Sequence, residues 1–206
     1  VFTQDVNENN GRMGIIEIDN KKIITPTYAP TKNEFVSLSN SERISKRDYK
    51  NAKIGEYVCW LDKEQLWNLK NKDGAYNSKK AAFRAELENI DVPTKIIHYN
   101  FFDDVNTIDS EQLEVLLDLQ LDSGADVIQI LNIYKKYDYA MAIEKSLAWK
   151  SGKCIDNPLM GIVCKRSDLD LLKTRTSSIE SIGINLSQFN KPILIGVKNE
   201  LKAKDV

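Results

Sequence analysis

Short apolar runs alternate with amphipathic stretches along most of the chain. Leucines at three- and four-residue spacing predict a helix that begins after Asp109 and ends at Gly124. The same kind of spacing predicts further helices after Asp62 and over residues 81–90, 137–150 and 167–179. Runs that are apolar throughout predict buried strands at residues 57–61, 95–100, 126–131, 158–164 and 192–197.

Strands of this kind, alternating with helices, are typical of a parallel sheet that is covered by helices. With a short strand at residues 25–30, the pattern predicts about six parallel strands. A closed (β/α) barrel has eight strands, so we expect an α/β chain that forms an incomplete TIM-type barrel. A doubly wound sheet satisfies the same pattern, but no G-x-G-x-x-G motif follows any of the predicted strands.

The start of the chain has a different pattern. Residues 1–12 are polar and rich in Asn, so we expect a flexible lead-in, followed by one barrel domain over residues 13–206. Isoleucines at positions 16, 18, 23 and 24 flank the polar segment 19–22, which predicts an N-terminal β-hairpin. The polar segments that we expect to form loops are residues 31–53 and 70–80.

The charges are almost balanced, since 29 basic and 30 acidic residues give a net charge of −1. The chain as a whole therefore has no electrostatic bias toward nucleic acid. Its most basic stretch, residues 32–53, has the composition of a phosphate-contacting segment, although a solvated loop is the simpler interpretation. No apolar run approaches roughly 20 residues, so we expect no membrane span.

The three cysteines do not have the spacing of a metal motif, and their number is odd. We therefore expect reduced thiols, a cytoplasmic location and neither a metal nor another cofactor in this chain. The single histidine, His98, excludes a three-histidine zinc site within the chain. We expect His98 to be packed inside the strand 95–100.

Three stretches carry a resemblance to a known family. The first, residues 11–30, contains G-R-M-G followed by T-P and a second proline. The second, residues 109–128, contains D-S-E and then G-A-D-V-I, and the third is a helix that ends in Trp149, followed by L-M-G-I-V at residues 159–163. Their order and spacing resemble the tRNA-guanine transglycosylase (queuine or archaeosine tRNA-ribosyltransferase) family over about half of the chain.

The resemblance implies a barrel enzyme that exchanges guanine for a 7-deazaguanine base in tRNA or DNA. An aspartate that binds the guanine edge in the family corresponds to Asn132, and a glutamine corresponds to Cys164. Gly196 corresponds to a glycine whose backbone contacts the base, so these three residues are our candidate substrate-binding positions. The alternatives are an ordinary loop asparagine, a packing cysteine and a strand glycine.

The D-S-G-G-F-Q motif that carries a catalytic aspartate in the family is absent from this sequence. Asp103 and Asp104 follow the strand 95–100, where a general base would lie, so they are the candidate catalytic residues. Loop capping is the alternative role for both. The resemblance places the nucleophilic aspartate and the cysteines of a structural zinc site beyond the sixth strand, and the chain ends before them. We therefore expect this chain alone to be inactive.

Three functions remain open on this basis. One is base exchange on tRNA or DNA, with guanine or 7-deazaguanine as the second substrate. Another is a non-catalytic relative that binds nucleic acid or a partner subunit in a homo- or hetero-oligomer, which the changes at Asn132 and Cys164 favour. The third is an unrelated barrel enzyme that acts on a phosphorylated metabolite, but no glycine-rich phosphate loop supports it.

Overall fold

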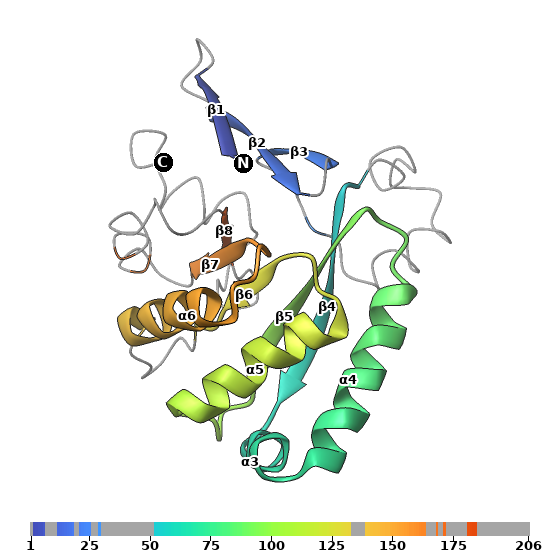
Figure 1. Cartoon of the computed structure of the whole chain (residues 1–206), viewed down its shortest axis with the longest axis vertical. Coiled ribbons are helices and arrows are strands. Elements are labelled where there is room, and N and C mark those ends of the chain that lie inside the picture. The colour runs from blue at the N-terminus through green and yellow to red at the C-terminus, as the bar shows by residue number, and fades with distance from the viewer. Residues whose placement is uncertain are drawn as a thin grey trace.

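The computed structural model describes residues 2–6, 12–18, 21–25, 29, 52–132, 139–163, 168, 171 and 181–184. These residues form a mixed α/β structure in which short parallel strands alternate with helices (Figure 1). The predicted strands at 25–30 and 192–197 lie outside the described residues, except for Thr25 and Ala29. The strands are β1 (Phe2–Val6), β2 (Arg12–Ile18), β3 (Lys21–Thr25), β4 (Ile54–Leu61), β5 (Thr94–Phe101), β6 (Ile128–Ile130), β7 (Leu159–Val163) and β8 (Ser181–Ile184), and the helices are α3 (Lys63–Asn71), α4 (Asp73–Glu88), α5 (Ser110–Ser123) and α6 (Tyr139–Lys153).

The N-terminal strands form an antiparallel sheet in the order β1-β2-β3. The pairing of Ile16 with Ile23 confirms the predicted hairpin. The expectation of a lead-in without regular structure is wrong for residues 2–6, because β1 pairs along its whole length with β2. Backbone pairing needs no apolar alternation, so the composition of this segment did not reveal the strand.

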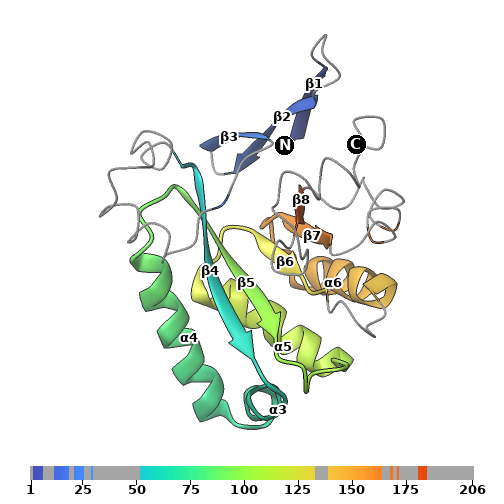
Figure 2. The ribbon, with the colours of Figure 1, turned by 180° about the vertical axis from the view of Figure 1, so that it is seen from behind.

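Strands β4 and β5 form a parallel ladder that runs from the pair Ile54–Thr94 to the pair Leu61–Phe101. Side chains alternate between the two faces of a strand. One face, which includes Leu61 and Tyr99, packs against the helices in the main apolar cluster. The opposite face, seen from behind in Figure 2, includes Ile96 in a second, smaller cluster with side chains from β7.

Helices α3 and α4 are separated by a single residue, Lys72. The predicted loop over residues 70–80 is therefore wrong, since most of it lies in these two helices. The ammonium groups of Lys79 and Lys80 lie 5.7 and 5.6 Å from the ring centroids of Phe83 and Tyr76. Polar residues in this segment thus cover aromatic rings on their own helix, which a count of apolar residues does not detect.

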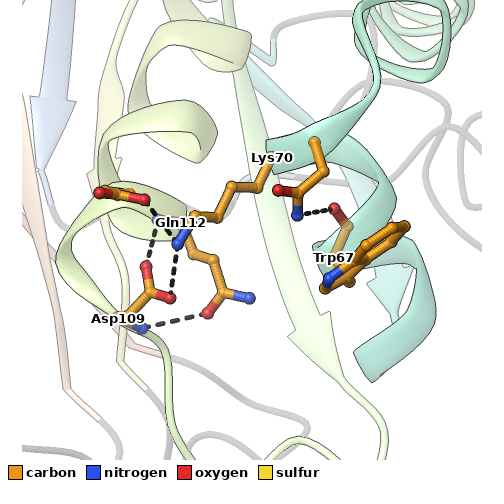
Figure 3. Close-up of polar contacts among 6 residues, drawn as sticks. Trp67, Lys70, Asp109 and Gln112 are labelled. Atoms are coloured by element: carbon orange, nitrogen blue, oxygen red, sulfur yellow. Dashed lines mark hydrogen bonds and ion pairs between the residues drawn. The ribbon is translucent and has the colours of Figure 1, made fainter.

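Helix α5 begins and ends as its cap residues predict. Asp109 accepts a hydrogen bond from the backbone of Gln112 at 2.8 Å, and the Gln112 side chain bonds the backbone of Asp109 in return. Gly124 follows the helix with a φ of 88°, a conformation that glycine adopts without strain. Lys70 of α3 binds Asp109 at 3.0 Å and Glu111 at 2.6 Å, which joins α3 to the start of α5 (Figure 3).

The second half of the chain contributes a parallel sheet in the order β6-β7-β8. Helix α6 ends later than predicted and passes through Gly152. Strand β8 was not predicted, because Ser181–Ile184 is short and comes directly after the helix predicted over residues 167–179. With β4 and β5, five of the described strands lie in parallel ladders, which confirms the predicted alternation of parallel strands and helices. Among the described residues, no helix is long and apolar enough to cross a membrane.

The cap of α5 is a test of local stability. Burial acts to raise the pKa of Asp109, but the hydrogen bond from the Gln112 backbone and the Lys70 ammonium outweigh it and lower that pKa. The free energy of unfolding of the Asp109→Ala variant should be about 1 kcal/mol lower than that of wild type at neutral pH. The Asp109→Asn variant should lose less, because asparagine also caps helices. Urea denaturation of both variants measures the difference.

The same cap should make stability depend on pH. The folded-state pKa of Asp109 is lowered below its unfolded value of about 3.9. The stabilisation that the Asp109 carboxylate gives to the folded state is therefore complete above that unfolded value, and it is lost as the pH falls through the folded-state pKa. The difference in the free energy of unfolding between wild type and Asp109→Ala should therefore become smaller as the pH falls over this range. A gap that stays constant into strong acid would contradict the assignment.

Candidate functional site at the carboxyl ends of the parallel strands

Strand β6 has only three residues, and side chains complete its hydrogen bonding on the side that faces β5. The Gln129 backbone N–H donates to Oε1 of Gln120 at 2.7 Å, and its carbonyl accepts from Nε2 of Gln120 at 3.1 Å. Gln120 belongs to α5 and is fully buried. Its amide therefore takes the place that a neighbouring strand backbone would have in a continuous sheet.

The Gln129 side chain reaches in turn toward β5. Its Oε1 accepts a hydrogen bond of 3.1 Å from the Tyr99 backbone N–H. At the amino ends of the two strands the backbones are close, since Ile96 and Val127 form a parallel bridge and the Asp126 N–H bonds the Lys95 carbonyl at 2.8 Å. The backbones of β5 and β6 therefore pair at their amino ends, and further along the two strands are joined through the side chains of Gln120 and Gln129. The strands separate toward their carboxyl ends, and α/β proteins bind ligands where neighbouring parallel strands separate in this way.

On the side that faces β7, strand β6 ends at Ile130, opposite Gly161, while β7 continues to Val163. Side chains bond the β7 backbone where β6 no longer reaches it. The Ile162 carbonyl of β7 accepts a hydrogen bond of 2.8 Å from Nδ2 of Asn132. The Ile162 N–H donates to the Tyr139 hydroxyl at 2.7 Å. Asn132 follows β6 and Tyr139 begins α6, so the residues on either side of positions 133–138 are both held against β7.

Asn132 is the only candidate substrate-binding residue that falls within the described ranges. It is buried, and its amide also donates to Oδ2 of the fully buried Asp168 at 2.8 Å. Two acceptors thus hold the Nδ2 group, which fixes the orientation of the amide. No residue in the described part of the chain donates to Asn132 Oδ1 in a contact that we observe. The position of Asn132 at a strand end is as predicted, but its donors are used within the chain.

A second buried polar pair lies on β5. His98 Nε2 is 3.2 Å from Asn100 Oδ1, and both side chains are more than nine-tenths buried. They alternate with Ile97 and Tyr99, which face the helices. His98 and Asn100 therefore belong to the other face, on the same side of the sheet as Ile96. His98 lies inside a strand as expected.

The candidate catalytic residues Asp103 and Asp104 are exposed on the loop after β5. Asp104 Oδ2 accepts a hydrogen bond of 3.1 Å from the Lys63 backbone N–H, in the first turn of α3. This contact caps a helix, which is the alternative role considered for these residues. Cys164 and Gly196, the other two candidate substrate-binding residues, lie outside the described residues.

Metal or thiol chemistry has little support within the described part of the chain. No three side chains among its His, Cys, Asp and Glu residues gather to hold a metal ion. Burial raises the pKa of the Cys59 thiol, although nearby Lys79 acts in the opposite direction. A buried thiol with a raised pKa is a weak nucleophile and is best explained by packing.

Sequence reasoning missed the polar partners that define this site. For Asn100, a signal was present, since polar side chains at positions 98 and 100 alternate with apolar ones at 97, 99 and 101. Gln120 and Gln129 look like ordinary polar positions near a helix end and in a strand. Asp168 lies 36 residues after Asn132, so no local pattern connects the two.

Comparison with known proteins adds no family assignment. No family model matches the chain, and no curated protein matches it either.

The environment of Asn132 predicts how its substitution affects folding. In Asn132→Asp a carboxylate would face the Ile162 carbonyl and the Asp168 carboxyl group, with no N–H between them. This variant should lose about 2–4 kcal/mol of unfolding free energy, because buried acceptors are left without donors. Asn89→Asp is the matched control, since the exposed Asn89 amide donates to the Ala85 carbonyl of α4. Equal losses for the two variants in urea denaturation would contradict the assignment.

Proposed function

We propose that this chain is a tRNA-guanine transglycosylase-like (β/α) barrel protein that acts in base exchange on tRNA or DNA. The support is the motif resemblance, together with parallel strands that alternate with helices in the order such a barrel requires. Barrels of this class bind their substrates at the carboxyl ends of the strands. Four buried polar residues lie near these strand ends. His98 and Asn100 lie in the second half of β5, Asn132 follows β6, and Asp168 follows β7.

The orientation of Asn132 is the observation that carries the proposal. Both of its N–H groups are directed at Ile162 and Asp168, so the group left for a ligand is the carbonyl oxygen. An oxygen acceptor at this position can receive the N1–H or the amino group of a guanine edge, as an aspartate would. The change from aspartate to asparagine therefore keeps the acceptor. It adds the two donors that Ile162 and Asp168 require.

In this proposal Asp168 is a positioning residue, because it holds the amide of Asn132 rather than the base. His98 and Asn100 belong to the adjacent strand and would contact another edge of the bound ring or its ribose. A nucleotide must leave its base stack to reach such a site, which costs least in a single-stranded or looped region. The nucleophile for the exchange step is not assigned among the described residues.

Base selectivity tests the proposal without any variant. Guanine and 7-deazaguanine present an N1–H donor, whereas adenine presents an acceptor at the same place. A site built around a fixed acceptor rejects a ligand that lacks the donor. Isothermal titration of the purified chain should give at least about tenfold weaker binding for adenine than for 7-deazaguanine. Equal affinities for the two bases would rule out the proposed role of Asn132.

A non-catalytic relative that binds nucleic acid or a partner subunit is the second candidate. It is favoured by the exposure of Asp103 and Asp104 and by the use of Asp104 as a helix cap. The two candidates differ in one result, the incorporation of labelled guanine into tRNA. Because we expect this chain alone to be inactive, base selectivity without incorporation fits both candidates. Incorporation above a no-protein control requires the first.

A further inference from the structure

Two exposed aromatic rings lie together at the carboxyl ends of β4 and β5. Trp60 is 47% exposed and Phe102 is 49% exposed, although most large apolar side chains of the described residues are buried. Their ring centroids are 5.3 Å apart with an interplanar angle of 42°. Two half-exposed rings in contact form an apolar surface open to a flat ligand, which we call the Trp60–Phe102 platform.

The backbone holds this platform in place. The Phe102 N–H donates to the Leu61 carbonyl at 3.0 Å, which extends the pairing between the ends of β4 and β5. The Phe102 carbonyl accepts from the Val105 N–H at 3.0 Å, which closes a tight turn directly after β5. The backbone that carries Phe102 is therefore ordered before a ligand arrives, which reduces the conformational entropy lost on binding.

The platform adjoins the polar residues of the candidate site. Trp60 and Asn100 are direct partners in the parallel ladder, so their side chains emerge on the same face of the sheet. Asn100 is buried and contacts His98, whereas Trp60 reaches the surface. On this face of the sheet, buried polar side chains are therefore followed by solvent-exposed aromatic rings at the edge of the site.

The charges near the platform determine what kind of contact it can make. The charged residues nearest in sequence include three carboxylates, Asp62, Asp103 and Asp104, against the single cation Lys63. Asp62 and Asp104 cap the start of α3. Carboxylates disfavour a phosphate group at this point. A nucleic acid would thus be held here through the face of a base and not through its backbone. Stacking on aromatic rings suits this, because every base has an apolar face.

We propose that the Trp60–Phe102 platform stacks a base of single-stranded nucleic acid next to the nucleotide whose base enters the site. This inference rests on the proposed function, because a base that leaves its stack to enter a site deprives its neighbour of a stacking partner. The two rings replace that partner. The substrate class is therefore a single-stranded or looped nucleic acid, and not a free base alone or a continuous duplex.

The test compares Trp60→Leu and Phe102→Leu with Trp67→Leu by fluorescence anisotropy of a labelled single-stranded oligonucleotide. Trp67 is the matched control, since it is 54% exposed on α3 and lies outside the platform, with the Lys72 ammonium 5.2 Å from its ring centroid. The two platform variants should bind about 5- to 150-fold more weakly than wild type. The control should bind as wild type does, and Trp60→Phe should restore most of the affinity.

The salt dependence separates stacking from a phosphate contact. The slope of log affinity against log salt should be the same in wild type and Trp60→Leu, because no phosphate contact is lost. An oligonucleotide with one abasic position at the platform should bind wild type and Trp60→Leu equally. A reduced salt slope in the variant, or an equal loss in Trp67→Leu, would overturn the stacking assignment.

The remaining outcomes distinguish this inference from the proposed function. If the platform variants bind the oligonucleotide as wild type does while 7-deazaguanine is still preferred over adenine, the platform is wrong and the function stands. If the bases are not discriminated but the platform variants still lose affinity, the function fails and the platform stands. No affinity of the wild-type chain for the oligonucleotide, or a change only in oligomeric state in the variants, would overturn the platform.

Discussion

The amide of Gln120 on the backbone of Gln129 is the contact on which the arrangement of the strand ends depends. A fully buried N–H and carbonyl must find partners, and here a side chain from α5 supplies both at once. The Gln129 side chain is then available to the Tyr99 N–H of β5. Without these two amides, β5 and β6 would have either to pair directly or to leave buried backbone groups without partners. Direct pairing would remove the separation at their carboxyl ends.

Beyond the end of β6, side chains again bond backbone groups that no neighbouring strand reaches. Asn132 and Tyr139 bond the carbonyl and the N–H of Ile162, which β6 is too short to reach. The position of Asn132 therefore reflects two demands. It must donate to β7 and to Asp168, and in our proposal it presents its remaining oxygen to a base. An aspartate would meet the second demand and fail the first, which gives a physical reason for asparagine at this position.

Local chemistry predicted the elements whose signals are contained in a few adjacent residues. The cap at Asp109 and the glycine at position 124 marked both ends of α5, because each acts on the backbone next to it. The start of α4 and strand β8 were missed, since one depends on lysine stems that cover aromatic rings and the other on pairing with β7. For the site, the strand-end position of Asn132 was predictable. Its contacts with Asp168 and Ile162 were not, because both partners are 30 or more residues away.

The measurement that tests this account most directly is amide hydrogen exchange at Tyr99 in wild type and in Gln129→Leu. In wild type the Tyr99 N–H should be protected, because Gln129 Oε1 accepts its hydrogen bond. In the variant its protection should fall at least about tenfold, whereas the Phe102 N–H, which bonds the Leu61 carbonyl, should remain protected. Unchanged protection of Tyr99 in the variant would mean that β5 and β6 pair directly, which would contradict the side-chain junction on which the candidate site depends.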